Sequence, residues 1–367
     1  MISTAVAARE LAAPSGPRDL DCVGAAYAAD PDALIAAVRR HRLEAPLADV
    51  LDRLDLPVPA VMADDVADDR VTRLRVAATL RRVAEVLDGD AIPWVTFKGP
   101  VLSALMTRPE LRTYNDLDLL VGAADLERAL DVLGGCGVQE INRNWAPYIR
   151  HRVGEVPLDA GDLSVDLHWH VVGLGRQRRA IRFDPVEMLG RRRSVRVGDE
   201  NVPTFDAADQ LLHLAVHTAT AGATRLDQLR DIAVAVSADA PDWTEFERRA
   251  RVAGVATLVA HALDRSARLL DAPVDEAVLR RMAGRSLDRR RRADGERVVD
   301  LKGRGVWWRR DRSLDSLRDG GAQVWETIRR GAGGWDFADE RSHVFFEHDS
   351  GGPEGRRRYL DLVREHA

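Results

Sequence analysis

Residues 111–121 read LRTYNDLDLLV, and this segment carries the most informative pattern in the chain. Side chains alternate between the two faces of a β-strand, so Asp116 and Asp118 fall on the same face. The opposite face is apolar and comprises Leu117, Leu119 and Val121. Two carboxylates this close on one face repel each other unless a cation lies between them. Residues 114–121 therefore predict a packed strand with a divalent-metal site, for which oxygen ligands suit Mg²⁺ or Mn²⁺.

A second strand of the same character is expected over residues 164–172. Its polar face comprises Asp166, His168 and His170, and its apolar face comprises Val165, Leu167 and Trp169. If the two strands are neighbours, Asp166 completes a three-carboxylate cluster that is able to bridge two metal ions about 3.5–4 Å apart. Because His168 shares a strand face with Asp166, we expect it to border this site.

A phosphate-binding turn is expected upstream of the carboxylates. Residues 92–97 predict a short strand, and Lys98 and Gly99 follow it at the start of a short helix. A helix N-terminus with a glycine offers free N–H groups to a phosphate, Lys98 adds a compact positive charge, and Arg112 adds a second one. A phosphate-binding turn together with a metal-binding carboxylate pair is what the transfer of a nucleotidyl or phosphoryl group requires. The structural alternative is a set of surface acids and a turn glycine.

The composition excludes several classes of protein. The 367 residues include 45% hydrophobic and 31% charged residues, which fits a folded protein rather than a disordered chain. The formal charge of −5 gives no reason to expect wholesale binding of nucleic acid or anionic membrane. Cys22 and Cys136 cannot form a disulfide framework, and with an N-terminus unlike a signal peptide they predict reduced thiols in the cytoplasm. Of the 54 basic residues, only Lys98 and Lys302 are lysines.

The expected fold class is α+β, with a small mixed β-sheet flanked by helices. The sequence divides into four regions. Strand and helix patterns alternate in the second region, and the first and third regions are helical. The four regions are 1–90 (helical), 91–205 (α/β core), 206–285 (helical) and 286–367 (rich in Arg and Trp, then in Gly and acidic residues). We expect residues 331–356 to be loosely ordered.

The chain resembles the bacterial uncharacterised nucleotidyltransferase family, which belongs to the DNA polymerase β-like nucleotidyltransferase superfamily. The motifs that carry this resemblance are residues 94–99, 112–121 and 165–169, with a helical signature at 211–217, 225–226 and 231–233. The resemblance covers about residues 70–240. It implies that the carboxylates lie on the small mixed sheet and that a helical domain follows it.

The resemblance also implies roles for individual residues. Asp116 and Asp118 would hold metal bound to the nucleoside triphosphate. Asp166 would hold the catalytic metal and accept the proton of the acceptor hydroxyl. Lys98 and Gly99 would contact the phosphates. The implied partners are an NTP such as ATP and a small-molecule or peptide acceptor, with no membrane involved.

One departure from the superfamily pattern leaves a second function open. The superfamily commonly has Gly-Ser where this chain has Gly99 followed by Pro100, so a hydroxyl that would bind phosphate is missing. Proline in the first helical turn still permits the helix. A non-catalytic nucleotide-binding protein or a scaffold of a biosynthetic cluster is therefore an alternative to an enzyme.

The remaining polar motifs have structural interpretations. His213 and His217 lie four residues apart on one helix face, and we expect packed histidines rather than metal ligands because no partner ligand stands at suitable spacing. Arg225 and Asp231 are expected to form structural ion pairs. The run 289–292 contains four arginines and predicts a solvated helix face. With Trp307 and Trp308 nearby, the alternative is RNA binding by a toxin-like nucleotidyltransferase.

Overall fold

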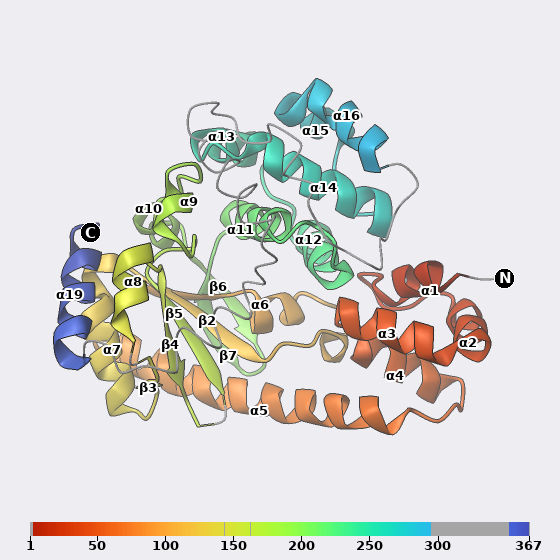
Figure 1. Cartoon of the computed structure of the whole chain (residues 1–367), viewed down its shortest axis with the longest axis horizontal. Coiled ribbons are helices and arrows are strands. Elements are labelled where there is room, and N and C mark those ends of the chain that lie inside the picture. The colour runs from red at the N-terminus through yellow and green to blue at the C-terminus, as the bar shows by residue number, and fades with distance from the viewer. Residues whose placement is uncertain (1–2, 143, 162, 295–351, 367) are drawn as a thin grey trace.

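A five-stranded mixed β-sheet lies at the centre of the chain in a computed structural model that describes residues 3–142, 144–161, 163–294 and 352–366 (Figure 1). The sheet has the strand order β1-β2-β5-β4-β3. Its strands are β1 (Trp94–Phe97), β2 (Asp116–Val121), β3 (Gln139–Glu140), β4 (Glu155–Asp159) and β5 (Ser164–His168). Only β2 and β5 pair in parallel, and the other pairs are antiparallel. The α+β fold expected from the sequence is therefore confirmed.

Helices surround this sheet and a separate hairpin formed by β6 (Arg193–Val197) and β7 (Glu200–Thr204). The helices before and within the sheet region are α1 (Thr4–Leu11), α2 (Leu20–Ala29), α3 (Pro31–His41), α4 (Glu44–Arg53), α5 (Ala60–Gly89), α6 (Gly99–Ala104), α7 (Leu126–Gly135), α8 (Trp145–His151), α9 (Gly175–Arg178) and α10 (Pro185–Gly190), with short 3₁₀ turns η1 (Pro109–Leu111) and η2 (Ala123–Asp125). Those after it are α11 (Ala207–Thr220), α12 (Leu226–Ala238), α13 (Trp243–Val252), α14 (Ala256–Leu270), α15 (Glu276–Ala283), α16 (Arg285–Asp294) and α19 (Gly352–Arg364).

Aspartate caps begin many of these helices. At α3 the Asp30 side chain accepts a hydrogen bond from the Ala33 N–H, and Pro31 occupies the first turn, where proline is favoured. A side-chain oxygen at this position satisfies an N–H group that the helix itself leaves unpaired. The other aspartate caps are Asp19, Asp184, Asp206, Asp242 and Asp275. The acidic residues of the chain therefore fix the starts of helices throughout the fold.

The two faces of the sheet have different surroundings. On one face, apolar residues of β2 and β5 pack against the long helix α5 and against α7, with Leu80, Leu119 and Leu167 completely or almost completely buried. The alternation that buries Leu119 turns Asp118 to the other face. That face becomes apolar further along, where Phe97 and Leu120 pack against α10 and Phe205.

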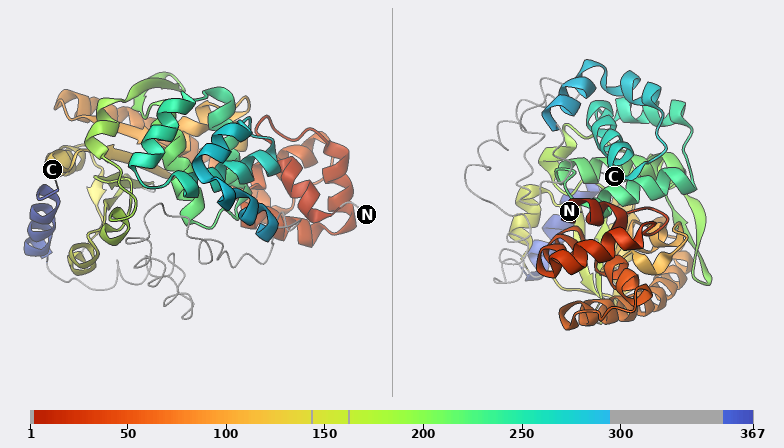
Figure 2. Two further views of the ribbon diagram at one scale, coloured as in Figure 1. Left: turned by 90° about the horizontal axis from the view of Figure 1, so that it is seen from above. Right: turned by 90° about the vertical axis from the view of Figure 1, so that its right-hand side faces the viewer.

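The N-terminal helices pack against the helical region that follows the sheet. One hydrophobic core joins buried residues of α1–α4 to α12 and α14, among them Leu47, Leu229 and Leu269. Figure 2 shows α1–α4 at one end of the molecule and α19 at the opposite end. The division into four regions stays a prediction, but this shared core ties the first region to the third.

Three predicted strands are shorter in the structure. The strand expected at residues 92–97 begins at Trp94, because the Ile92 N–H bonds back to the Leu87 carbonyl of α5. The strand expected at residues 114–121 begins at Asp116, because the 3₁₀ turn η1 precedes it closely. The strand expected at 164–172 ends at His168, because the N–H groups of Trp169 and His170 both turn to the Gly154 carbonyl. His170 is consequently not on the carboxylate face, and its Nδ1 accepts a hydrogen bond from Val172.

Three strands and the last helix have no counterpart among the predictions. The strands are β4 and the β6–β7 hairpin. Of the segment 331–356, expected to be loosely ordered, residues 331–351 lie outside the described part of the chain, and 352–356 form the first turn of α19 instead. Apolar residues of α19 join the core beneath the sheet, which explains why this end of the chain is helical.

Two sequence expectations concern the compartment. Cys22 and Cys136 are free thiols. Within the described residues, no helix combines the length and the apolar composition that crossing a membrane requires.

Tyr359 provides a test of how α19 packs against the core beneath the sheet. Its side chain is fully buried, its hydroxyl donates to the Val153 carbonyl at 2.8 Å, and it accepts from Trp169 Nε1 at 2.8 Å. We expect Tyr359→Phe to lower the free energy of unfolding by about 1 kcal/mol, and Tyr359→Ala by about 3–5 kcal/mol. Urea unfolding measures both. Tyr27→Phe, at a half-buried tyrosine of α2, is the matched control and should leave the free energy of unfolding unchanged. Equal effects of the two Phe variants would contradict the role of Tyr359 in packing α19 against the core.

Candidate active site

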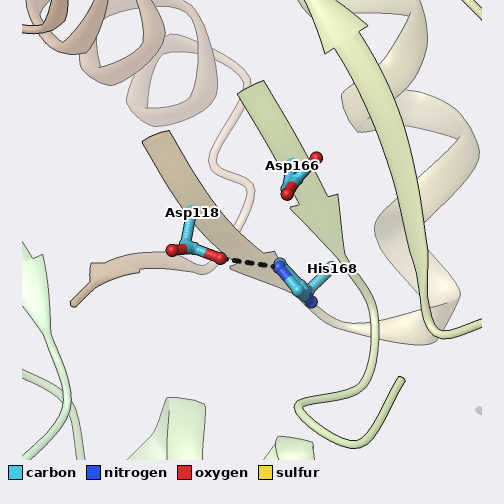
Figure 3. A group of neighbouring side chains, drawn as sticks. All are labelled: Asp118, Asp166 and His168. Atoms are coloured by element: carbon cyan, nitrogen blue, oxygen red, sulfur yellow. Dashed lines mark hydrogen bonds and ion pairs between the residues drawn. The ribbon is translucent and has the colours of Figure 1, made fainter. Parts of the chain in front are cut away.

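The pairing of β2 with β5 brings two of the predicted carboxylates together. The parallel register places Asp118 directly beside Asp166, and Leu120 beside His168. Asp118, Asp166 and His168 each offer a ligand atom, and these atoms all lie within 4.8 Å of one another (Figure 3). Adjacent strands and the period of two are sufficient to assemble this cluster from residues far apart in the sequence.

Asp118 carries a buried negative charge that two neighbours neutralise. Its side chain is 5% exposed, and its Oδ1 lies 2.9 Å from Lys98 Nζ and 3.0 Å from His168 Nε2. Burial by itself raises the pKa of a carboxylic acid. Here the charge of Lys98 and the hydrogen bond from His168 outweigh burial and hold the pKa of Asp118 well below its usual range. These two neighbours therefore favour the ionised form of Asp118.

His168 lies between two carboxylates. Its Nε2 contacts Asp118, and its Nδ1 lies 3.3 Å from Glu155 Oε2. Burial opposes a charged imidazole, but Asp118 and Glu155 raise the pKa of His168 above its ordinary value. The β4–β5 register explains the second contact, since it pairs Glu155 directly with His168. His168 thus lies beside Asp118, and Glu155 contacts it from the neighbouring strand.

Asp116 occupies the same strand face, one alternate position before Asp118. It is half-buried, and burial followed by the charge of Asp118 raises its pKa. Lys98, Arg42 and Arg112 oppose this rise. The carboxylates on this strand therefore repel each other as the sequence predicts, and nearby cations offset the repulsion only in part.

The donor set fits a hard divalent cation. Two carboxylates and an imidazole approach one another closely, and Asp116 adds a third carboxylate on the same face. Mg²⁺ and Mn²⁺ prefer oxygen ligands and accept an occasional imidazole. Burial and the charge of Asp118 raise the pKa of Asp116, and a cation held between these carboxylates would relieve their repulsion.

The turn between β1 and α6 holds Lys98 in an unusual backbone conformation. Its φ of 57° and ψ of −127° lie in a region that residues with a Cβ rarely adopt. Such strain concentrates at functional sites, where the surrounding structure maintains it. A Cβ added to Gly99 would meet Asp116 and Tyr114 at 3.5 Å, an ordinary contact, so packing alone does not require glycine there.

Arg112 connects the turn to the helical region. Its Nε and Nη2 donate to the two carboxylate oxygens of Asp231 at 2.8 Å, and its Nη1 donates to the Gly99 carbonyl at 3.0 Å. The Arg112 side chain is 10% exposed. These bonds engage three nitrogens of the guanidinium within the protein. Its predicted contact with phosphate stays a prediction, and its observed partners give it a positioning role.

Helix α11 places the two histidines beyond Phe97. The His213 ring lies 5.0 Å from the Phe97 ring and stacks with His217 at 6.2 Å. Burial lowers the pKa of His213 well below its ordinary value, so this ring is neutral. His217 Nε2 lies 3.4 Å from the Gln228 amide nitrogen. Both histidines are packed as the sequence predicts, and neither belongs to the cluster around Asp118.

The other polar motifs fall partly within the described chain. Arg225 pairs with Asp227, and Asp231 with Arg112, which confirms the structural role expected for Arg225 and Asp231. In the arginine run of α16, Arg291 pairs with Asp264 and Glu276. Trp307 and Trp308 lie outside the described residues.

Sequence reasoning missed two partners of the site. Glu155, beside His168, lies on β4, whose sequence contains Pro157 and follows a glycine, so it gave no strand signal. Asp231 was expected to pair, but its partner Arg112 lies on a different region of the chain. Only the tertiary structure supplies these two contacts.

Comparison with known proteins gives a family. A family model described as an uncharacterised nucleotidyltransferase matches residues 27–271. Among the curated proteins, nothing matches. The solved structures similar to this chain include the following two. The antibiotic-resistance factor ANT(2'')-Ia has 11% identity and a TM-score of 0.35 over 55% of this chain and 96% of its own. A nucleotidyltransferase-like protein from Paracoccidioides brasiliensis has 16% identity and a TM-score of 0.35 over 56% and 96%.

The Arg112–Asp231 pair predicts an asymmetry between two neighbouring aspartates of α12. Asp231→Asn leaves the Arg112 charge buried without its partner, so we expect a loss of about 3–5 kcal/mol in the free energy of unfolding. Asp227→Asn disrupts the more exposed pair with Arg225 and should cost less than about 1 kcal/mol. Chemical denaturation monitored by tryptophan fluorescence measures both, and equal losses would show that the buried pair does not hold the turn.

Proposed function

This chain belongs to the uncharacterised nucleotidyltransferase family, and we propose a specific reaction for it. As a nucleotidyltransferase it transfers a nucleoside monophosphate from an NTP. We propose that the transfer depends on a divalent metal, that the acceptor is a hydroxyl or phosphate group of a small molecule or peptide, and that pyrophosphate is released. The observation that carries the proposal is the approach of Asp118 and Asp166 on adjacent strands beside Lys98.

We expect the three carboxylates to hold the metal. Asp116 and Asp118 share one strand face, and the register brings Asp166 beside Asp118. Bound Mg²⁺ or Mn²⁺ would neutralise phosphate charge and stabilise the charge that develops on the reacting phosphate. The chain prepares the site by keeping Asp118 ionised, because Lys98 and His168 favour its charged form.

The transfer step conserves atoms and charge. The acceptor oxygen forms a bond to the α-phosphorus, and the bond from that phosphorus to the oxygen bridging to the β-phosphate breaks. Pyrophosphate leaves with the bonding electron pair, and the acceptor proton passes to the Asp166 carboxylate, which acts as general base. The protein contributes mainly position and electrostatic stabilisation.

The triphosphate is expected to lie against the turn between β1 and α6. Lys98 Nζ is 2.9 Å from Asp118, and the side chain keeps 21% of its surface exposed. Pro100 leaves α6 intact. Ser103, the next hydroxyl along this helix, is buried and donates to the Pro109 carbonyl, so it does not replace the missing hydroxyl. Phosphate binding is therefore assigned to Lys98 and the backbone of Gly99.

We propose a cytoplasmic location, supported by the two free cysteines. An RNA acceptor is the alternative, and within the basic run expected to bind it, Arg291 is already in ion pairs with Asp264 and Glu276.

The reaction predicts that Asp118→Asn abolishes transfer. The assay supplies each of the four α-labelled NTPs with Mg²⁺ and a mixture of metabolites and peptides, and measures pyrophosphate and labelled acceptor. We expect a loss of about 10³-fold, because the substitution removes a charge that acts on the reacting phosphate. Asp159→Asn, at an exposed aspartate of β4, is the control and should retain full activity. Undiminished transfer by Asp118→Asn, with the circular dichroism unchanged, would refute the assignment.

Lys98→Arg tests the phosphate-binding turn without changing the net charge. Lys98 Nζ lies between Asp118 and the Phe97 ring, whose centroid is 5.2 Å away, and a planar guanidinium is larger than the ammonium that fits there. We expect kcat/KM for the NTP to fall about tenfold, the size of one weakened charged hydrogen bond. Lys302→Arg is the matched control and should have no effect. Equal kinetics of the two variants would remove the special role of Lys98.

A further inference from the structure

The long helix α5 carries apolar residues on two opposite faces. Its inner face packs into the core beneath the sheet through Val76, Leu80 and Val83, which are almost completely buried. Its outer face carries Val71, which is 44% exposed, and Leu74, which is 74% exposed and is the most exposed large apolar side chain among the described residues. Figure 1 shows α5 along the lower edge of the molecule. Single apolar residues on a surface are common, so the exposure of Leu74 gains meaning only from its neighbours.

The outer face of α5 follows a regular repeat along the whole helix. Exposed residues stand at spacings of four and three in turn: Ala60, Asp64, Ala67, Val71, Leu74, Ala78, Arg81 and Glu85. An average of 3.5 residues per turn is the repeat by which one helix keeps a seam against another helix. The middle of this seam is apolar, and its alanines allow two helix axes to approach closely. The next position outward is acidic at one end, Asp64, and basic at the other, Arg81.

The charges of the seam select a second copy of α5 in the antiparallel direction. In a parallel pair, Asp64 would meet the same aspartate of the second copy, and Arg81 the same arginine, so that like charges repel at both ends. In an antiparallel pair centred between Val71 and Leu74, Asp64 faces the second copy's Arg81 at both ends. The same register places Val71 opposite the second copy's Leu74. The outer face of α5 is therefore complementary to itself about a two-fold axis, as a closed dimer requires.

A second pair of opposite charges lies on one flank of the seam. Asp68 and Arg75 are both exposed, and each follows an apolar seam position directly. In the antiparallel register, Asp68 faces the second copy's Arg75, which is the flanking contact that sets orientation in paired helices. Within one copy, Arg81 Nε contacts Glu200 at 2.8 Å, but the arginine side chain stays 68% exposed. An exposed pair of this kind contributes at most about 1 kcal/mol, so it does not oppose a contact between copies.

We propose that two copies of this chain form a dimer through the outer faces of their α5 helices, packed antiparallel. The proposal goes beyond the proposed function, which needs no second copy. The large apolar side chains of the seam are Val71 and Leu74, so the dimer is a weak one, with a Kd in the micromolar range. Because α5 covers the sheet face opposite to Asp118, the dimer leaves both active sites accessible.

Sedimentation equilibrium of the full chain tests the proposal, over concentrations from about 1 to 100 μM to suit a weak interface. Leu74→Glu should raise the Kd of the dimer at least about 100-fold, because it puts a charge at the centre of the seam twice per dimer. Its exposed position predicts an unchanged circular dichroism spectrum. Val186→Glu is the matched control, at an apolar residue of α10 that is 64% exposed, and it should dimerise as the wild type does.

An exchange of charges tests the direction of the pairing. Asp64→Arg and Arg81→Asp should each raise the Kd of the dimer about tenfold, because each brings like charges together at both ends of the seam. The protein with both substitutions should return to within about twofold of the wild type, since opposite charges face each other again. Within one helix the two positions are about 25 Å apart, so this recovery can arise only between copies.

Three results would overturn the proposal. The first is a wild-type protein that stays monomeric at the highest concentration, which would also be the result if another segment of the same chain covered this face. The second is a dimer that persists undiminished in Leu74→Glu. The third is a dimer that the single charge substitutions weaken but their combination does not restore, which would exclude the antiparallel register.

Discussion

The site depends on one constraint, which is the placement of the Asp118 charge inside the sheet. A carboxylate that is only 5% exposed is costly to ionise unless cations stand beside it. Lys98 and His168 provide that compensation at 2.9 and 3.0 Å, on the same oxygen. Each compensating group needs support in turn. Lys98 adopts a strained backbone at the end of β1, and His168 is backed by Glu155 on β4.

The surrounding architecture serves to keep these groups in register. Parallel pairing of β2 with β5 sets Asp166 beside Asp118, and the apolar alternate face anchors both strands on α5 and α7. Arg112 ties the turn after β1 to α12 through Asp231. The N-terminal helices share a core with α12 and α14. Parts of the chain that look separate in sequence thus meet at one site.

Much of this arrangement could be predicted from local pattern, and the rest could not. The period of two places Asp116 and Asp118 on one face, and Asp30 with Pro31 predicts the start of α3. Strand alternation also identifies Asp166, but the pairing of its strand with β2 is a tertiary fact. The alternation predicts that this strand continues to residue 172, but it ends at His168. The Gly154 carbonyl accepts the backbone hydrogen bonds of the turn that ends the strand, and the hydropathy pattern does not indicate such bonds. The partner of Arg112 stands 119 positions away, which no local pattern can indicate.

The central claim is that the charged cluster at Asp118 and Asp166 binds a divalent metal together with an NTP. Electron paramagnetic resonance of Mn²⁺ tests it most directly, by titrating the metal into the full chain with an ATP analogue that cannot be cleaved between the α- and β-phosphates. The account predicts bound Mn²⁺ in the wild type and its loss in both Asp118→Asn and Asp166→Asn. Mn²⁺ binding that persists in both variants, or its absence from the wild type with each of the four nucleotide analogues, would contradict the account.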